Sequence, residues 1–188
     1  MPDLYTDELV EAFALPGCPV CRVRAIDERR RLDSFGREGR NDPDVRQRFF
    51  DAGGFCREHA WRLHGLGGPA VADLYGKLAE RELRGVERRS RRRGRGCPAC
   101  EAAEAAAERK RYFLVEALAS PVLRERYARS EGLCFPDLAG ALEQANGELA
   151  RFLVDDWRER LRQALADEDW TGLVRRYAGD PKVVLGSG

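Results

Sequence analysis

Apolar residues recur every three or four positions along this chain, and no segment shows the strict alternation that predicts a β-strand. A leucine-rich stripe predicts the longest helix over residues 136–166, and a second stripe predicts a helix over 70–92. The alanine-rich segment 101–119 has a high intrinsic helix propensity and predicts a third. We therefore expect an all-α protein.

Proline marks the predicted beginning of several helices. Four dipeptides place proline at the first position of a predicted helix: Cys18-Pro19, Asp42-Pro43, Cys97-Pro98 and Ser120-Pro121. In two of them, Asp42 and Ser120 also offer a capping side chain. The second and fourth predict short helices over 43–51 and 121–130, which glycine ends. A further helix is expected to begin near Cys56 and another near Cys134.

The cysteines reveal an internal repeat of about 78 residues. The motif CPVC at 18–21 returns as CPAC at 97–100, and Cys56 returns as Cys134. Between these motifs, DPDVRQRFFDAGGFC from Asp42 aligns without a gap on SPVLRERYARSEGLC from Ser120. Agreement among so many unlike residue types predicts two pseudo-repeats, 1–95 and 96–188, which we expect to share one core.

Each repeat offers four metal ligands. They are Cys18, Cys21, Cys56 and His59 in the first repeat, and Cys97, Cys100, Cys134 and Asp137 in the second. Two short chelating pairs separated by a long segment are typical of zinc sites, because ligands three residues apart can bind one tetrahedral ion without backbone strain. Asp137 has a second interpretation, since an aspartate in the first turn of a helix often serves only as a cap.

The ligands can be paired in two ways. Pairing within each repeat is the simpler arrangement, since the entropic cost of loop closure rises with the number of residues enclosed. In the exchanged arrangement Cys18 and Cys21 meet Cys134 and Asp137, and both intervening segments are long enough to allow it. A carboxylate in place of an imidazole adds negative charge, so we expect arginine close to Asp137.

Composition narrows the class of protein. The 188 residues are 43% hydrophobic and 35% charged with a net charge of +1, which predicts a soluble protein without a general attraction to nucleic acid or acidic membranes. No apolar run is long enough for a membrane span, and MPDLYTDELVEAF lacks the basic start of a signal peptide. We therefore expect a cytoplasmic protein, in which six cysteines indicate metal or thiol chemistry rather than disulfides.

Closed sets of four protein ligands predict two mainly structural zinc sites in an interaction or regulatory module with an unidentified protein partner. The alternative is a thiol-based redox or metal-responsive switch, with zinc or an iron–sulfur cluster at the CPxC pairs. Catalysis by Cys56 and His59 has little support, because no third group orients the pair. The basic run Arg88–Arg95 is more typical of a solvated linker than of a nucleic-acid patch.

The motifs CPVC, GFCREHAWRL, CPAC and SEGLCFP, followed by a leucine-striped helix, resemble an uncharacterised bacterial family known only as a domain of unknown function. Members of that family carry paired Cys-Pro-x-Cys and Gly-Phe/Leu-Cys-x-x-His motifs. The similarity covers residues 14–170 and implies metal binding at the eight positions, without implying an activity. In that family both third-cysteine motifs usually end in histidine, whereas this chain has Asp137 at the second.

Overall fold

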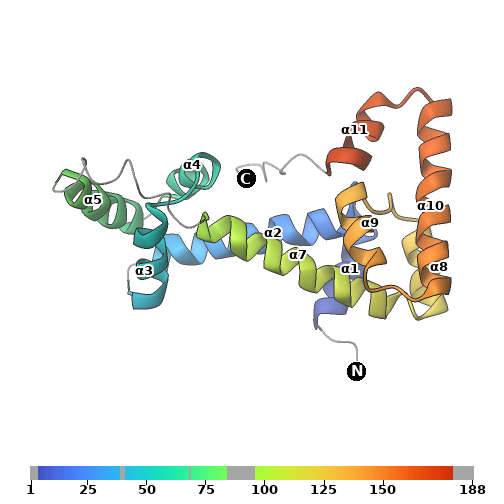
Figure 1. Ribbon diagram of the computed structural model, residues 1–188, viewed down its shortest axis with the longest axis horizontal. Helices are drawn as coiled ribbons and strands as arrows, with labels where there is room; N and C mark the ends of the chain where they lie inside the picture. Colours follow the sequence, from blue (N-terminus) through green and yellow to red (C-terminus); the bar gives the residue numbers. More distant parts are fainter. Residues whose placement is uncertain (1–3, 39–40, 68, 84–95, 180–188) are drawn as a thin grey trace. The chain divides into compact units, whose positions relative to one another are not determined.

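The computed structural model describes residues 4–38, 41–67, 69–83 and 96–179, and all regular elements in these ranges are α-helices. In chain order (Figure 1) they are α1 (Leu4–Ala12), α2 (Pro19–Glu38), α3 (Pro43–Ala52), α4 (Arg57–Leu66), α5 (Pro69–Leu83), α7 (Pro98–Ala117), α8 (Pro121–Ala128), α9 (Phe135–Leu142), α10 (Gly147–Ala166) and α11 (Trp170–Ala178). The prediction of an all-α protein is confirmed.

The predicted helix starts after proline are confirmed for α2, α3, α7 and α8. Asp42 caps α3, since its Oδ1 accepts hydrogen bonds from the backbone N–H groups of Asp44 and Val45 at 2.9 and 3.1 Å. Ser120 holds the cap position of α8 without a side-chain hydrogen bond. Gly53, with φ of +73°, ends α3 in the left-handed conformation that glycine adopts without strain.

The prediction of a single helix over 136–166 is wrong. The structure has two helices there, α9 and α10, with a turn after Leu142. Asn146 begins the second one, because its Oδ1 accepts a hydrogen bond from the N–H of Leu149 at 3.0 Å. The apolar stripe runs through both helices, and its period therefore conceals the break. Of the helix predicted over 70–92, α5 accounts for the part up to Leu83, and the remainder lies outside the described residues.

The chain forms two compact units, and their boundaries differ from the predicted division at 95/96. The terminal unit combines Met1–Ile26 with Ala105–Gly188, and the central unit is Asp27–Glu104. Helices α2 and α7 contribute to both units. The terminal unit receives the beginning of α2 and the end of α7, whereas the central unit receives the end of α2 and the beginning of α7.

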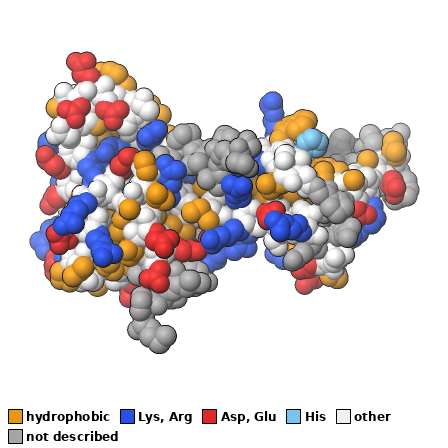
Figure 2. All heavy atoms as spheres, turned by 180° about the vertical axis from the view of Figure 1, so that it is seen from behind, with side chains coloured by type: hydrophobic (Ala, Val, Ile, Leu, Met, Phe, Trp, Pro, Cys, Tyr) orange, Lys and Arg blue, Asp and Glu red, His pale blue; other side chains and the backbone are white. Residues whose placement is uncertain are grey.

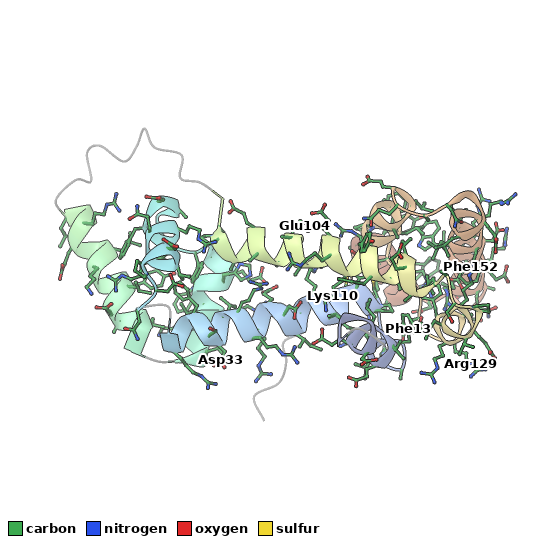
Figure 3. The ribbon with its side chains drawn as sticks, turned by 90° about the horizontal axis from the view of Figure 1, so that it is seen from below. Phe13, Asp33, Glu104, Lys110, Arg129 and Phe152 are labelled. Carbon is green, nitrogen blue, oxygen red and sulfur yellow. The ribbon has the colours of Figure 1, made fainter. Side chains whose placement is uncertain are left out.

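The core of the terminal unit surrounds Tyr127 of α8, which is 1% exposed. Its ring packs edge-on against Phe13 at a centroid distance of 5.8 Å and lies 6.0 Å from Phe152 of α10. Lys110 of α7 is also buried in this unit, and its Nζ lies 2.6 Å from Oε2 of Glu8. Figure 3 labels Phe13, which directly follows α1, Lys110 of α7 and Phe152 of α10. Burial of the lysine is offset by this ion pair.

The core of the central unit surrounds Phe49 of α3, which is fully buried. Its ring lies 5.2–5.7 Å from those of four other aromatic residues: Phe35, Phe50, Phe55 and Tyr75. In the predicted repeat, Phe49 aligns with Tyr127, the central residue of the other core. This agreement is what a duplication would produce, but the repeat itself stays a prediction.

The surface carries both signs of charge. On the face shown in Figure 2, Lys and Arg side chains lie among Asp and Glu side chains. Within the described ranges, no helix combines the length and the apolar character needed to cross a bilayer. The basic run Arg88–Arg95, and with it the comparison of linker and nucleic-acid patch, lies outside the described residues.

We expect Phe49→Ala to lower the free energy of unfolding by about 3–5 kcal/mol, because it removes the ring around which the central core packs. Urea denaturation followed by circular dichroism measures this loss. Val122→Ala, at a side chain that is 62% exposed on α8, is the control and should change stability by less than about 0.5 kcal/mol. Equal losses in the two variants would contradict the assignment of Phe49 to the core.

Candidate metal centres

The eight predicted ligands come together as two groups of four. The histidine cluster consists of Cys56, His59, Cys97 and Cys100, and the aspartate cluster consists of Cys18, Cys21, Cys134 and Asp137. In each cluster the ligand atoms all lie within 4.8 Å of one another. All six cysteines are free thiols, so no disulfide competes with the clusters for sulfur. The histidine cluster lies wholly in the central unit and the aspartate cluster wholly in the terminal unit.

Pairing within each repeat, favoured above because it encloses shorter loops, is not what the structure shows. Each cluster instead joins the CPxC pair of one predicted repeat to the pair formed by the third cysteine and the fourth ligand of the other repeat. The reason is the rigidity of α2 and α7, which begin at the prolines of the CPxC motifs and have 20 residues each. A helix of that length carries the chain about 30 Å from its first turn, so Cys56 and Cys134 follow at the far ends of these helices. A flexible-loop estimate omits this stiffness.

Both clusters are built from the first turns of two helices. The carbonyl oxygens of Cys18 and Cys97 accept the first hydrogen bonds of α2 and α7, at 3.0 Å in each case. Cys56 and Cys134 hold the cap positions of α4 and α9 in the same way. The remaining ligands lie three residues further on, so each cluster takes its four ligands from two helix N-termini. The partial positive charge at a helix N-terminus stabilises thiolate and carboxylate groups.

In the histidine cluster, Nδ1 of His59 faces three sulfur atoms. It lies 3.1 Å from Sγ of Cys56, 3.6 Å from that of Cys97 and 3.4 Å from that of Cys100. The sulfurs of Cys56 and Cys100 are 3.8 Å apart. His59 is buried, the Cys56 and Cys97 side chains are half-buried, and Cys100 is exposed. This cluster is therefore open to solvent on the Cys100 side.

Glu28 of α2 holds the His59 ring in place. The carboxylate is buried, its Oε1 lies 2.9 Å from Nε2 of His59, and Arg62 also donates to it. A carboxylate acceptor at Nε2 places the proton there and leaves Nδ1 to face the sulfurs, an arrangement common behind metal-bound histidines. In the absence of a metal ion, the hydrogen bond with Glu28 raises the pKa of His59 to about 9.

In the aspartate cluster, the two carboxylate oxygens of Asp137 have different partners. Oδ2 lies 3.2–3.4 Å from the sulfurs of Cys134, Cys18 and Cys21, and Oδ1 accepts a hydrogen bond from Nη1 of Arg111 at 3.1 Å. Cys134, not Asp137, holds the cap position of α9, and no side-chain capping bond is made there. Asp137 is therefore directed at the thiols. The arginine expected beside it is present as Arg111.

Burial prevents the aspartate cluster from ionising fully unless a cation lies beside it. All four of its residues are buried, whereas Cys100 of the histidine cluster is exposed. Burial raises the pKa of Cys18 well above its usual value, and burial together with the nearby Cys21 raises that of Asp137. Three thiols and a carboxyl cannot all ionise at such short distances without a positive charge among them. A divalent ion would supply that charge, and Arg111 adds to it.

Gly179, at the C-terminal end of α11, covers the aspartate cluster from another direction. Its φ is +81°, and a Cβ at this position would lie 3.3 Å from Sγ of Cys21 and 3.7 Å from that of Cys134. Both the backbone conformation and the lack of a side chain favour glycine here. On the opposite side of Cys134, the N–H of Leu133 donates to the Tyr127 hydroxyl at 3.2 Å, which ties the ligand turn to the core.

Sequence reasoning missed the residues that support the ligands, chiefly Glu28 and Arg111. Glu28 orients His59, so the expectation that no third group orients Cys56 and His59 is wrong. The repeat could not reveal them, because Glu28 has an alanine in the matching column of the second CPxC helix and Arg111 has a leucine in the first. They nevertheless play reciprocal parts. Helix α2 supplies two ligands to the aspartate cluster and, through Glu28, supports the histidine cluster. Helix α7 supplies two ligands to the histidine cluster and, through Arg111, supports the aspartate cluster.

The comparisons with known proteins return no relative. No protein-family model matches the chain, and neither a curated protein nor a solved structure matches it. The resemblance to the uncharacterised bacterial family stays a prediction based on the motifs quoted above.

In metal-free protein we expect Cys56 to be alkylated fastest. Burial raises its pKa, but hydrogen bonds from the backbone and ring of His59 outweigh burial and lower it from its usual 9.0 to about 7. Because the lowered pKa favours the thiolate above that pH, iodoacetamide modification should become half-maximal near pH 7, while Cys18 stays unreactive. Peptide mass spectrometry across a pH series measures this. A midpoint near 9 at Cys56 would contradict the assigned contact with His59.

We expect Glu28→Gln to weaken metal binding at the histidine cluster by about 10–100-fold, because the amide is a weaker acceptor for the Nε2 proton of His59. Competition with a chromogenic chelator measures the affinity, and the aspartate cluster should keep its metal. Glu80→Gln, at an exposed position of α5 in the same unit, is the matched control and should change neither site. Equal affinities in the two variants would show that Glu28 does not support His59.

Proposed function

We propose that this chain is a zinc-binding helical protein with two mainly structural metal sites, and that it works as an interaction or regulatory module. The observation that carries the proposal is the spacing of the donor atoms. Zinc–sulfur bonds of about 2.3 Å at tetrahedral angles separate two sulfurs by about 3.8 Å. The sulfurs of Cys21 and Cys134 lie 3.7 Å apart and those of Cys56 and Cys100 lie 3.8 Å apart, and the contacts of sulfur to nitrogen and oxygen are 3.1–3.6 Å.

The same spacing favours a single ion over an iron–sulfur cluster. A cluster places several iron and sulfide atoms between its thiolate ligands and so spreads those ligands further apart. Here all four donor atoms of each group lie within 4.8 Å of one another. Three thiolates with one imidazole or carboxylate are ligands that zinc accepts.

A structural role follows from ligand number and position. Four protein ligands complete a tetrahedron and leave no coordination position for substrate. In each cluster the ligands come from segments far apart in the chain, so metal binding would join those segments and contribute to folding, on the order of 10–16 kcal/mol per site in zinc-finger peptides. We also propose that the two halves arose by duplication, that the protein belongs to the bacterial family its motifs resemble, and that it is cytoplasmic.

A thiol switch at the histidine cluster is the second candidate, favoured by the exposure of Cys100. Its sulfur lies 3.8 Å from that of Cys56. Hydrogen peroxide would oxidise the two thiolates to a disulfide, taking up two protons to form two water molecules, and the ion would lose two ligands. The buried aspartate cluster would resist the same treatment.

We expect gently purified protein to contain two zinc ions per chain, measured by plasma mass spectrometry. Cys18→Ser and Cys134→Ser should each lower the ratio to one, and the double variant should also hold one, since both ligands belong to the aspartate cluster. Cys18→Ser combined with Cys56→Ser should hold none, because the two residues belong to different clusters.

The first double variant serves as the control for the second, since each lacks two cysteines. Metal-free wild-type protein would refute the proposed function. Loss of both ions in the Cys18→Ser and Cys134→Ser double variant, with one retained in the Cys18→Ser and Cys56→Ser variant, would refute the exchanged pairing.

A further inference from the structure

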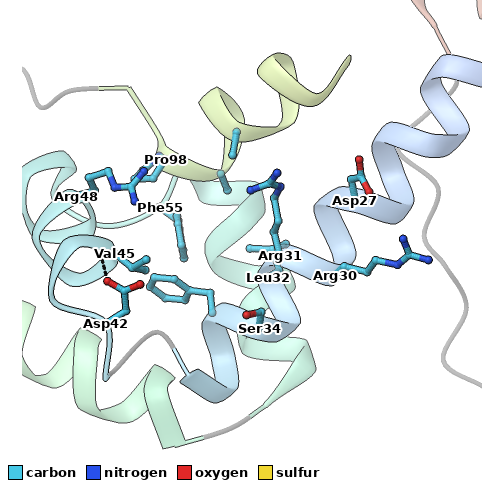
Figure 4. Close-up of a pocket in the computed structure, with 13 residues that line it drawn as sticks. Asp27, Arg30, Arg31, Leu32, Ser34, Asp42, Val45, Arg48, Phe55 and Pro98 are labelled. Atoms are coloured by element: carbon cyan, nitrogen blue, oxygen red, sulfur yellow. Dashed lines mark hydrogen bonds between the residues drawn. The ribbon is translucent and has the colours of Figure 1, made fainter. Parts of the chain in front are cut away.

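The central unit contains a cavity beside the histidine cluster that none of the metal ligands occupies. Its volume is about 490 Å³, and its walls come from α2, α3, the segment before α4 and the first turns of α7 (Figure 4). Small-molecule sites in proteins typically measure about 300–1,000 Å³. The cavity is therefore large enough for an organic molecule of the size of a bicyclic aromatic acid.

The inner walls of the cavity are apolar. They are formed by Leu32, Phe35, Val45, Phe55, Pro98 and Ala102. The rings of Phe35 and Phe55 lie 4.7 Å apart in an edge-on arrangement, so one aromatic wall is already ordered. A ligand with a flat apolar body would remove its surface from water here, which supplies affinity without specificity.

Two arginines provide positive charge above these walls. Figure 4 shows Arg31 of α2 and Arg48 of α3 on either side of Phe55. Arg48 makes a weak hydrogen bond from Nε to the carbonyl oxygen of Asp44 at 3.4 Å. Within the described part of the chain, neither guanidinium is paired with a carboxylate. Two unpaired guanidinium groups over an apolar wall favour a carboxylate, which guanidinium binds through two parallel hydrogen bonds.

The lining contains three arginines, Arg30, Arg31 and Arg48, against two acidic residues, Asp27 and Asp42, and so keeps a net positive charge. Oδ1 of Asp42 accepts the two capping hydrogen bonds at the start of α3, as the dashed line in Figure 4 indicates for Val45. Asp27 lies nearer the N-terminal end of α2 than Arg31, and in the same view it is further from Phe55. The side of the cavity next to Phe55 thus has a positive character.

We propose that this cavity binds a small organic anion, a carboxylate on an aromatic or aliphatic body. Arg31 and Arg48 hold the carboxylate, and the wall formed by Phe35, Phe55 and Pro98 holds the apolar body.

Binding in the cavity is linked to the metal state of the histidine cluster, a part of the inference that rests on the proposed zinc binding. Phe55 directly precedes Cys56, and Pro98 lies between Cys97 and Cys100. The residues that line the cavity are thus held by the turns that carry three of the four ligands. A metal ion that joins these turns completes the cavity, and a bound anion therefore raises the affinity of the histidine cluster for the ion, since linkage between binding free energies is reciprocal.

The charge requirement is tested with 2-naphthoate and its neutral analogue 2-naphthamide, by calorimetry on the full chain at pH 7. Naphthoate should bind at least tenfold more tightly than naphthamide. Arg31→Gln and Arg48→Gln should each weaken naphthoate binding by about tenfold and leave naphthamide unchanged. Arg37→Gln, at an exposed position of the same helix, is the control and should have no effect. Equal binding of the two probes would overturn the proposal, as would equal losses in all three variants.

Ala102→Phe tests the location, because a ring on this wall of α7 fills the cavity without removing an arginine. Both probes should lose binding, and circular dichroism should show unchanged helix content. Retained naphthoate binding in a folded Ala102→Phe variant would overturn the site.

The linkage is tested by equilibrium competition for zinc with a chromogenic chelator, with and without saturating naphthoate. The zinc affinity of the histidine cluster should rise by at least threefold, and that of the aspartate cluster should not change. Naphthoate binding with unchanged zinc affinity would overturn the linkage alone. Absence of metal from the purified protein would refute the proposed function while the charge test of the cavity still stands.

Discussion

The structure depends on the approach of two helix N-termini at each cluster. The ligand atoms of each cluster lie within 4.8 Å of one another: three thiols and a carboxyl in the aspartate cluster, and three thiols and an imidazole in the histidine cluster. Repulsion between the ionised thiols and carboxyl opposes that approach. A divalent cation would reverse the sign of the interaction, and the partial positive charge of the four helix N-termini acts in the same direction. The N-termini that meet are those of α2 and α9 at the aspartate cluster and those of α4 and α7 at the histidine cluster.

The two clusters bring their helix N-termini together in different surroundings. The aspartate cluster is enclosed in the terminal unit, with Arg111 on its carboxylate and Gly179 against its sulfurs. The histidine cluster has Glu28 behind its imidazole and leaves Cys100 exposed. Burial limits ligand exchange and oxidation at the first cluster, whereas exposure permits both at the second.

Both clusters depend on helices α2 and α7. Each begins with a CPxC pair that belongs to one cluster, and each later supplies the residue that supports the fourth ligand of the other, Glu28 for His59 and Arg111 for Asp137. A change that unwinds either helix therefore affects both sites. The cavity beside the histidine cluster adds a third element to this arrangement, since α2 and α7 also form two of its walls.

The sequence by itself determined the helical class, the starts of the helices at proline and the eight side chains that form the clusters, because these depend on local spacing and residue chemistry. It did not determine which ligands meet, since the loop-closure argument treats the two 20-residue helices that begin at the CPxC motifs as flexible chain. The break between α9 and α10 was hidden because the apolar period continues through it. Only the tertiary structure decided the pairing, the supporting roles of Glu28 and Arg111 and the coverage by Gly179. Each of these depends on residues distant in the chain, brought together by stiff helices whose directions the core sets.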